Sequence, residues 1–462
     1  MKDNAPTFVI IGKPNNGKSS MISALTFNDK VEVSEKVGTT LRRASYSYIR
    51  DNKIVCSFYD TPGFESAKDI WKYIKNNRAD NYGNNRLIKN YIRDNNNEES
   101  KQKDIEILEA ILDSDFLIFM INSSERFNKN SIGAELEIIN FVNKPTLVLF
   151  NQKSNEGYTR EWKNELVKYN LKIFHKINPL EMNFINIIDI YEKLNSVDSS
   201  IQNKRFLTNL KEIHKKHLEE NIEKSSKIIA IMIKNILHLE TEYQVSSEKI
   251  TNSDKEKALQ EYQNRIYKIE KDAKKEMAEI WGYYNIKIID TREEFNSKEN
   301  IELGLSKKRL MLLGIATGAG TGATITAPAS IFDMGITSAI SGTIGGTLGG
   351  VGAYLVGEKF HKAIISNKKI IYKIDKKAYN VTIILLKRSL EYLYRLIKHG
   401  HANRTDIIIP KKDENLLFNS QWSFPQNDVK DIMKIHRYIV QDEDTKKYVE
   451  QLSHIIANLQ IG

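Results

Sequence analysis

Residues 12–19 read Gly-Lys-Pro-Asn-Asn-Gly-Lys-Ser and fit the phosphate-binding pattern G-x-x-x-x-G-K-[ST]. They follow an apolar run at residues 8–11 that is typical of a buried strand, and residues 20–25 are compatible with a helix. A chain that turns from a strand into a helix through such a loop points successive backbone N–H groups inward, where they can bind a polyphosphate. The candidate nucleotide-binding residues of this loop are Gly12, Lys13, Pro14, Asn15, Asn16, Gly17, Lys18, Ser19 and Ser20.

Three side chains have the chemistry to hold the phosphates and a magnesium ion. We expect Lys18 to reach the β and γ phosphates and the Ser19 hydroxyl to ligate Mg2+. Thr40 ends the stretch at residues 37–40, which reads Val-Gly-Thr-Thr. A threonine in a mobile loop can complete the magnesium shell only while the γ-phosphate is present, which is what a nucleotide switch requires.

A second segment with such chemistry is the tetrapeptide at residues 60–63, Asp-Thr-Pro-Gly, which comes directly after an apolar strand. An aspartate at a strand end can hold magnesium through a water molecule, and the glycine can present its N–H to the γ-phosphate and move when that phosphate leaves. We therefore assign Asp60, with Ser19 and Thr40, to the metal site and Gly63 to the γ-phosphate.

A sheet must position these residues. Alternating apolar residues at 44–48 and 54–58 predict a pair of strands, and apolar runs at 116–121 and 145–150 predict two buried strands. Strands that alternate with helices indicate an α/β fold with a mostly parallel sheet and helices on both faces. The polar, asparagine-rich tract at residues 76–97 is expected to lengthen a surface loop instead of adding a core element.

The three segments together resemble the TrmE-Era class of translation-factor-like P-loop GTPases, over residues 1 to about 200. The resemblance implies GTP and GDP as ligands and hydrolysis of GTP. In that class a hydrophobic residue stands where Ras-like proteins place a catalytic glutamine, which matches Phe64. The resemblance also implies that Asn15 coordinates K+, which would stabilise the charge that develops during phosphoryl transfer. The implied catalytic residues are Lys18, Asn15, Thr40 and Gly63, with slow hydrolysis in the absence of potassium, self-association or a partner.

The base-recognition segment departs from the class. Residues 151–154 read Asn-Gln-Lys-Ser, where guanine is usually selected by Asn-Lys-x-Asp. Only Asn151 matches, because Ser154 lacks the charge and the bidentate geometry of the aspartate. No Ser-Ala-Lys follows the strand expected at residues 172–175. Guanine is the favoured base through the resemblance, and relaxed or adenine binding stays open as the alternative.

A narrower resemblance covers most of the chain. Residues 60–65, residues 148–151 followed by 160–162, and residues 400–402 look like a bacterial GTPase family whose C-terminal half is a domain of unknown function with a glycine-rich hydrophobic hairpin. This resemblance implies a family but little mechanism.

Composition limits the remaining possibilities. A chain of 462 residues predicts two or three domains, and its only cysteine, Cys56, excludes a disulfide framework and indicates a reducing compartment. Few residues precede the first strand, so we expect no secretory signal and a cytoplasmic protein. The 69 Lys and Arg residues exceed the 59 Asp and Glu residues, which gives a net charge of +10. This charge favours anionic partners such as nucleic acid or lipid headgroups, although a compositional bias explains the same excess.

We expect four regions: a P-loop GTPase domain at 1–198, a helical region at 199–309, a glycine-rich hydrophobic hairpin at 310–357 and a C-terminal helical region at 358–462. The strand signal disappears near residue 200, so everything after the first region is expected to be all-α. A capping box at Ser253 and Glu256 predicts the start of a long amphipathic helix. Its apolar stripe packs within the chain or, in the alternative, forms a coiled coil in a homodimer.

Residues farther along the chain are expected to continue this helical pattern. Apolar residues at 370–374 and 383–386 are interpreted as helix, and Gly400 as the turn that ends one. His399 and His401 flank that glycine without a nearby cysteine or carboxylate cluster, so a metal site there is not favoured.

Residues 310–357 contain a single charged residue, Asp333, between two uncharged runs that are long enough to cross a bilayer. Glycines at every fourth position on both sides predict two helices in close contact. The many glycine, serine and threonine residues weaken the case for membrane insertion. A hairpin buried in the protein and a hairpin that binds lipid at the inner face of the membrane therefore both stay open.

Three functional hypotheses follow. The favoured one is a GTP-hydrolysing switch whose nucleotide state controls the C-terminal helical half. The second is a membrane-acting protein whose hairpin is exposed by nucleotide state. The third is a GTPase linked to RNA, tRNA modification or the ribosome, and an unidentified protein partner is compatible with all three.

Overall fold

The computed structural model describes residues 5–27, 44–78, 83–151, 157–197, 200–284, 287–290, 361–366, 368–374, 379–403, 405–409, 426–441 and 445–458. Thr40, Ser154 and the glycine-rich stretch at 310–357 lie outside the described residues. The chain divides into two compact units. The first comprises Met1–Glu219, Gly282–Asn285 and Ile397–Thr405, and the second comprises Glu220–Trp281, Ile286–Leu396 and Asp406–Gly462.

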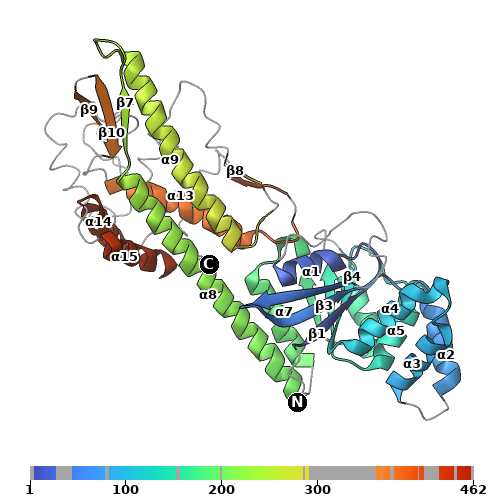
Figure 1. Cartoon of the computed structure of the whole chain (residues 1–462). Coiled ribbons are helices and arrows are strands. Elements are labelled where there is room, and N and C mark those ends of the chain that lie inside the picture. Colours follow the sequence, from blue (N-terminus) through green and yellow to red (C-terminus); the bar gives the residue numbers. More distant parts are fainter. Residues whose placement is uncertain are drawn as a thin grey trace, which may run out of the picture. The chain divides into compact units, whose positions relative to one another are not determined.

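The first unit contains a six-stranded sheet of order β2-β3-β1-β4-β5-β6 (Figure 1). β2 pairs antiparallel with β3, and the other neighbours pair in parallel. This topology confirms the predicted α/β fold. The strands are β1 (Thr7–Ile11), β2 (Ala44–Arg50), β3 (Lys53–Asp60), β4 (Phe116–Asn122), β5 (Thr146–Asn151) and β6 (Phe174–Ile177).

Helices cover both faces of this sheet, because the buried strands alternate their apolar side chains between two cores. In β1, Phe8 and Ile10 enter one core and Val9 and Ile11 enter the other. The first core is closed by α1 (Lys18–Thr26), α7 (Phe184–Val197) and the beginning of α8 (Ile201–Leu237). The second is closed by α2 (Ala67–Asn77), α3 (Asn84–Asn95), α4 (Gln102–Asp113), α5 (Lys129–Val142) and α6 (Thr159–Leu166).

Helix α3 corrects one prediction. The asparagine-rich tract at 76–97 was expected to form a surface loop, but it contains a helix that buries Leu87, Ile88 and Tyr91 in the second core. The three apolar residues stand at positions i, i+1 and i+4, which places them on one face of a helix. Asn84 and Asn85 are exposed, whereas Asn95 is buried and donates to the Tyr91 carbonyl oxygen at 2.8 Å, so the polar composition concealed a core element.

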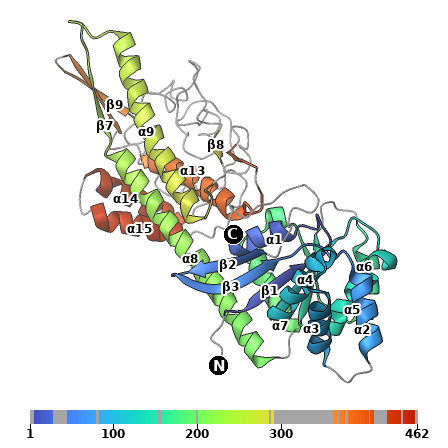
Figure 2. The same cartoon turned by 45° about the vertical axis from the view of Figure 1, so that its right-hand side comes forward.

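The second unit contains the long helix α9 (Asn252–Ile280), which packs against α13 (Tyr379–Lys398). Arg388 of α13 donates to Glu270 of α9 at 2.8 Å in a buried ion pair, and the Tyr392 hydroxyl donates to the Lys274 carbonyl oxygen at 2.8 Å. Two further helices, α14 (Gln426–Val440) and α15 (Thr445–Asn458), lie side by side (Figure 2). The predicted helical C-terminal region is thus confirmed in its main elements.

This unit also contains strands, so the description all-α is wrong. β7 (Glu240–Gln244), β10 (Lys369–Ile374) and β9 (His361–Ser366) form an antiparallel sheet of order β7-β10-β9, and the short strands β8 (Ile288–Asp290) and β11 (Ile407–Ile409) pair in parallel. Residues 370–374, interpreted as helical, belong to the central strand β10. Its buried residues Ile370, Tyr372 and Ile374 alternate with partly exposed ones, which is the period of a strand.

The capping box of α9 lies two residues before its predicted place. The Thr251 hydroxyl accepts the N–H of Asp254 at 3.2 Å, and the Asp254 carboxylate accepts the N–H of Thr251 at 2.9 Å. Ser253 therefore lies inside the helix. No helix within the described ranges is both long and apolar enough to span a bilayer.

Candidate functional site

The loop between β1 and α1 adopts a backbone that few residue types allow. Gly12, Asn15 and Gly17 have φ angles of 142°, 62° and 93°, all in the left-handed region. A β-carbon added at Gly12 would lie 2.4 Å from the carbonyl oxygen of Met120 in β4, so any larger residue there would push the loop off the sheet. The loop is therefore shaped by its glycines into the curved backbone that the phosphate-binding pattern predicts.

The Lys18 ammonium group lies across this loop. Nζ donates to the carbonyl oxygens of Gly12 at 2.9 Å and Lys13 at 3.0 Å, and the residue is only 7% exposed. Burial lowers the Lys18 pKa, while the charges of Asp60 and Glu135 oppose that shift. An anionic ligand would further favour the charged ammonium.

Ser19 and Asp60 meet at the carboxyl ends of β1 and β3. The Ser19 hydroxyl donates to Asp60 Oδ2 at 2.6 Å, and Asp60 is 2% exposed. Next to them, the Thr61 hydroxyl donates to the Ile10 carbonyl oxygen at 2.8 Å and fastens this end of β3 to β1. A hydroxyl and a carboxylate are oxygen ligands suited to Mg2+, so this donor set fits the ion. The third expected ligand, Thr40, lies outside the described residues.

Gly63 lies against the phosphate loop. A β-carbon added at Gly63 would lie 2.7 Å from Cδ of Pro14. This contact places the backbone of residue 63 beside the loop that would hold the phosphates, as its assignment to the γ-phosphate requires.

Asn151 comes to the same site from the end of β5. Its Nδ2 donates to the Asn16 carbonyl oxygen at 2.9 Å, and Asn16 Nδ2 donates in turn to the Met120 carbonyl oxygen at 2.7 Å. Both side chains are buried, so they tie the phosphate loop to β4 and β5. The structure thus brings together residues 12–20, Asp60, Gly63 and Asn151 at one edge of the sheet, where ligands bind in open α/β folds.

Asp104 was missed by the sequence analysis. It lies in the first turn of α4, is fully buried, and accepts the backbone N–H groups of Glu65 and Ser66, each at 2.9 Å. Burial raises its pKa although these two hydrogen bonds favour the charged form. Asp104 therefore fixes the backbone directly after Gly63. Its sequence position, 39 positions after Glu65, gave no signal of that contact.

Glu135 of α5 is a second missed residue. It is 6% exposed, and burial raises its pKa to about 7, against the opposing charges of Lys13 and Lys18. One turn earlier on α5, Ser131 accepts a hydrogen bond from the Lys13 ammonium group. A buried carboxyl group thus lies within the electrostatic reach of both lysines of the phosphate loop.

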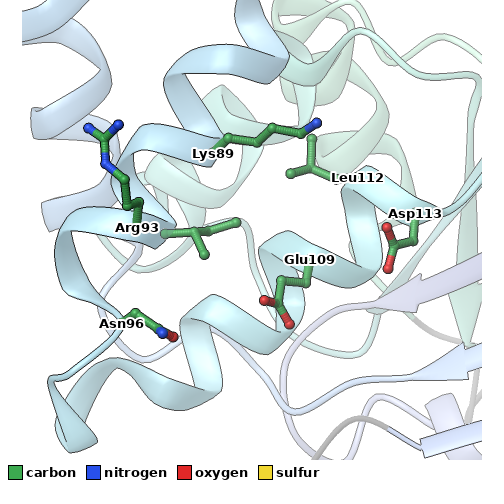
Figure 3. Close-up of a pocket in the computed structure, with 7 residues that line it drawn as sticks. Lys89, Arg93, Asn96, Glu109, Leu112 and Asp113 are labelled. Carbon is green, nitrogen blue, oxygen red and sulfur yellow. The ribbon is translucent and has the colours of Figure 1, made fainter.

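A separate hollow of about 470 Å3 lies between α3 and α4 (Figure 3). It is lined by Lys89, Ile92, Arg93 and Asn96 of the first helix segment and by Glu109, Leu112 and Asp113 of the second. Its charges are of both signs and none of the predicted site residues lines it. Within the described part of the chain, no group of three or more His, Cys, Asp or Glu side chains is arranged to hold a metal ion.

Comparisons with protein families agree with this geometry. The model described as "50S ribosome-binding GTPase" matches residues 7–152, and the model described as "Domain of unknown function (DUF3482)" matches residues 163–455. Among curated proteins, the tRNA modification GTPase MnmE of Blochmanniella pennsylvanica is 28% identical over 209 residues, which are 42% of this chain and 41% of the relative. MnmE of Staphylococcus aureus is 31% identical over 112 residues, 24% of each chain. The chain thus spans less than half the length of these relatives.

Solved structures give partial likenesses. An Era variant from Aquifex aeolicus with GDP and AlF4− has a TM-score of 0.30 at 19% identity, covering 42% of this chain and 58% of that one. Era in complex with MgGDPNP and a segment of 16S ribosomal RNA has a TM-score of 0.31 at 16% identity, covering 60% and 89%.

The sheet order, the loop geometry and the family matches lead to one assignment. Residues 7–152 form a P-loop GTPase domain that is similar to GTPases of the TrmE-Era class, as the resemblance implied. Because the second family model matches more than half of the residues, the chain belongs to the DUF3482 family and carries a P-loop GTPase domain before that region.

Proposed function

We propose that the whole protein is a magnesium-dependent switch that hydrolyses GTP to GDP and phosphate and thereby controls its C-terminal region. The observation that carries this proposal is the convergence of Lys18, Ser19, Asp60 and Gly63 at the carboxyl ends of β1 and β3. These are the groups needed to bind a metal-chelated triphosphate and to respond to the loss of its last phosphate.

Each residue has a separate task in this proposal. Lys18 exchanges its two carbonyl hydrogen bonds for the β and γ phosphate oxygens, and the loop N–H groups bind the same phosphates. Ser19 and Thr40 would ligate magnesium and Asp60 would hold it through water, and the ion would supply positive charge beside the phosphates. Gly63 presents its N–H to the γ-phosphate and is released when that phosphate leaves.

The proposal includes potassium as an activator. Asn15 has a left-handed backbone at the tip of the phosphate loop, which is compatible with a carboxamide turned toward a cation. We expect Asn15→Ala to remove the difference in phosphate release between potassium and sodium buffers while nucleotide binding persists.

The decisive experiment measures phosphate release from GTP and from ATP in potassium and in sodium. We expect release from GTP in potassium, and a loss of at least about 100-fold in Lys18→Ala, since electrostatic stabilisation is usually the largest catalytic contribution. Lys89→Ala, an exposed lysine on α3, is the matched control and should turn over like the wild type. Equal rates in Lys18→Ala and the wild type would contradict the assignment of the site.

Guanine selection through Asn151 is part of the same proposal. Displacement of a bound fluorescent GDP by GTP and by ATP tests this selection, and equal displacement by the two nucleotides would favour the relaxed-base alternative.

Three further expectations from the sequence also stand as proposals. They are the four regions at 1–198, 199–309, 310–357 and 358–462, a homodimer, and a cytoplasmic location.

Two alternative functions give different outcomes. Binding of membrane lipid through residues 310–357 at the inner face of the membrane predicts liposome flotation that depends on the nucleotide. A link to RNA, suggested by the names of the MnmE and Era relatives, predicts RNA binding that weakens with salt. Flotation without nucleotide dependence, or no RNA binding at low salt, would remove the respective alternative.

A further inference from the structure

Two short segments from the later part of the chain belong to the first compact unit. They are residues 282–284 and 397–403, which we call the clasp. The first follows α9 and the second includes the end of α13, so both are covalently continuous with helices of the second unit. One hydrogen bond, one ring contact and the close backbone approaches at Gly400 and Gly282, all described below, join the clasp to parts of the first unit that border the nucleotide site.

Gly400 makes the closest of these contacts. A β-carbon added at this position would lie 2.4 Å from the carbonyl oxygen of Leu180, 2.8 Å from its carbonyl carbon and 3.0 Å from the backbone nitrogen of Met182. These neighbours are backbone atoms of the short helix η4 (Pro179–Glu181) and the residue after it, so they cannot rotate away as a flexible side chain could. The clasp backbone is therefore seated directly on η4.

Helix η4 in turn borders the phosphate loop. It follows β6, the position where the sequence analysis sought the missing Ser-Ala-Lys. A β-carbon added at Gly17 would lie 2.6 Å from Asn151 Nδ2 and 3.6 Å from Cγ of Pro179. Pro179 and Asn151 thus both lie next to Gly17. Because Asn151 is the expected base-recognition residue, this is the side of the loop where the base is expected.

The neighbouring residue of the clasp contacts the other end of α1. The Ser23 hydroxyl donates to the His401 carbonyl oxygen at 3.1 Å, and the His401 ring meets the Phe27 ring edge-on at 5.4 Å. On its own side, His401 stacks on Tyr283 at 4.4 Å, and the Tyr283 hydroxyl donates to the His399 carbonyl oxygen. The two segments of the clasp therefore support each other.

Phe27 gives this contact its significance. It ends α1 in a left-handed conformation, with φ of 50°, and a β-carbon added at Gly282 would lie 2.9 Å from its carbonyl oxygen. Phe27 directly precedes the segment that contains Thr40. The clasp thus contacts two parts of the first unit. One is η4, which borders the side of the site assigned to the base, and the other is Phe27, which precedes the segment with the expected magnesium ligand Thr40.

We propose that the clasp buttresses the base side of the nucleotide site, with Gly400 as a positioning residue that fixes η4 and therefore Pro179 against Gly17 and Asn151. This inference rests on the nucleotide binding proposed above. Nucleotide affinity then depends on residues 397–403, and by thermodynamic reciprocity bound nucleotide stabilises the clasp.

The test uses the full chain and a fluorescent GDP. Gly400→Ala should release GDP about tenfold faster than the wild type, which corresponds to about 1.4 kcal/mol of binding free energy. Its affinity for tripolyphosphate, which lacks a base, should be unchanged because the loop N–H groups and Lys18 bind the phosphates. Gly83→Ala is the matched control, because a β-carbon there meets no atom within 4 Å, and it should release GDP like the wild type.

A second measurement needs no variant. In the wild type, GDP should slow hydrogen exchange at the backbone amides of residues 399–403. This measurement tests the proposal even when Gly400→Ala does not fold. Wild-type release rates in a folded Gly400→Ala, equal losses of GDP and tripolyphosphate affinity, or unchanged exchange at 399–403 would overturn the buttress. Failure of the wild type to bind GDP would instead overturn the proposed function.

Discussion

At the scale of single residues, the segment after Gly63 is held by one buried carboxylate. Asp104 accepts the N–H groups of Glu65 and Ser66, and Lys103 beside it pairs with Glu65 at 2.6 Å on the surface. The exposed pair contributes little, because solvent screens it, whereas the buried carboxylate satisfies two backbone donors. Asp104 therefore fixes the backbone of residues 65 and 66, which directly follow residues 63 and 64.

Asp104→Ala should lower the free energy of unfolding by about 1–3 kcal/mol, because two N–H groups lose their buried acceptor. Urea denaturation measures this change. The control is Glu109→Gln, which changes an exposed carboxylate on the same helix and should leave the urea midpoint of unfolding unchanged. A midpoint for Asp104→Ala equal to that of the wild type would show that the two N–H groups find another acceptor.

Glu135 predicts a pH dependence. Its pKa is raised from 4.5 to about 7 in the folded protein, so folding favours the protonated form. Its contribution to stability is complete below pH 4.5 and is lost as the pH rises through 7, with a fall of up to about 3 kcal/mol in the free energy of unfolding.

Glu135→Gln cannot ionise, so urea denaturation between pH 5 and 8 should show a smaller fall in stability for this variant than for the wild type. Glu137→Gln, two positions beyond on α5, is the control and should keep the wild-type slope. Parallel slopes for all three proteins would mean that Glu135 does not titrate in this range.

At the scale of elements, α2 and α3 follow Gly63 in the chain and precede α4. Both helices pack into the second core of the sheet, through Ile70 and Ile74 from α2 and Leu87 and Ile88 from α3. In the proposed switch, a shift of residues 63–66 on loss of the γ-phosphate would act on two packed helices. This arrangement gives the proposed switch a rigid surface that responds to the γ-phosphate.

The start of α9 distinguishes two possible caps. Thr251→Ala removes the hydroxyl that accepts the Asp254 N–H and should cost about 1 kcal/mol of stability. Ser253→Ala, inside the first turn, should be neutral within about 0.5 kcal/mol. Thermal unfolding followed by helical circular dichroism compares the two, and the reverse order of effects would restore the cap predicted from the sequence.

At the scale of the whole molecule, ligand binding should stabilise the unit that contains the site. GDP at 100 times its dissociation constant adds about 2.7 kcal/mol to the free energy of unfolding of that unit. Scanning calorimetry should show an upward shift of about 5–10 °C in one transition. Lys18→Ala should abolish the shift, and a shift of equal size in that variant would place GDP at another site.

The phosphate site was readable from the sequence because its geometry is local: Gly12, Gly17 and Lys18 act through the backbone of one loop. The apolar run at residues 8–11 likewise predicted a buried strand. Contacts between distant residues left no such signal, as Asp104 and Gly400 illustrate. Ile370 and Ile374 were misread because their spacing of four fits both a helix face and one face of a strand.

The clasp also has a consequence for biosynthesis. A ribosome that has added residue 219 must still add 184 residues before it completes residue 403, the last residue of the clasp. At about 5–20 residues per second this takes about 10–40 seconds. During that interval the nascent chain presents Ser23, Phe27 and the backbone of Leu180 without their final covering, so chaperones have a defined period in which to engage it.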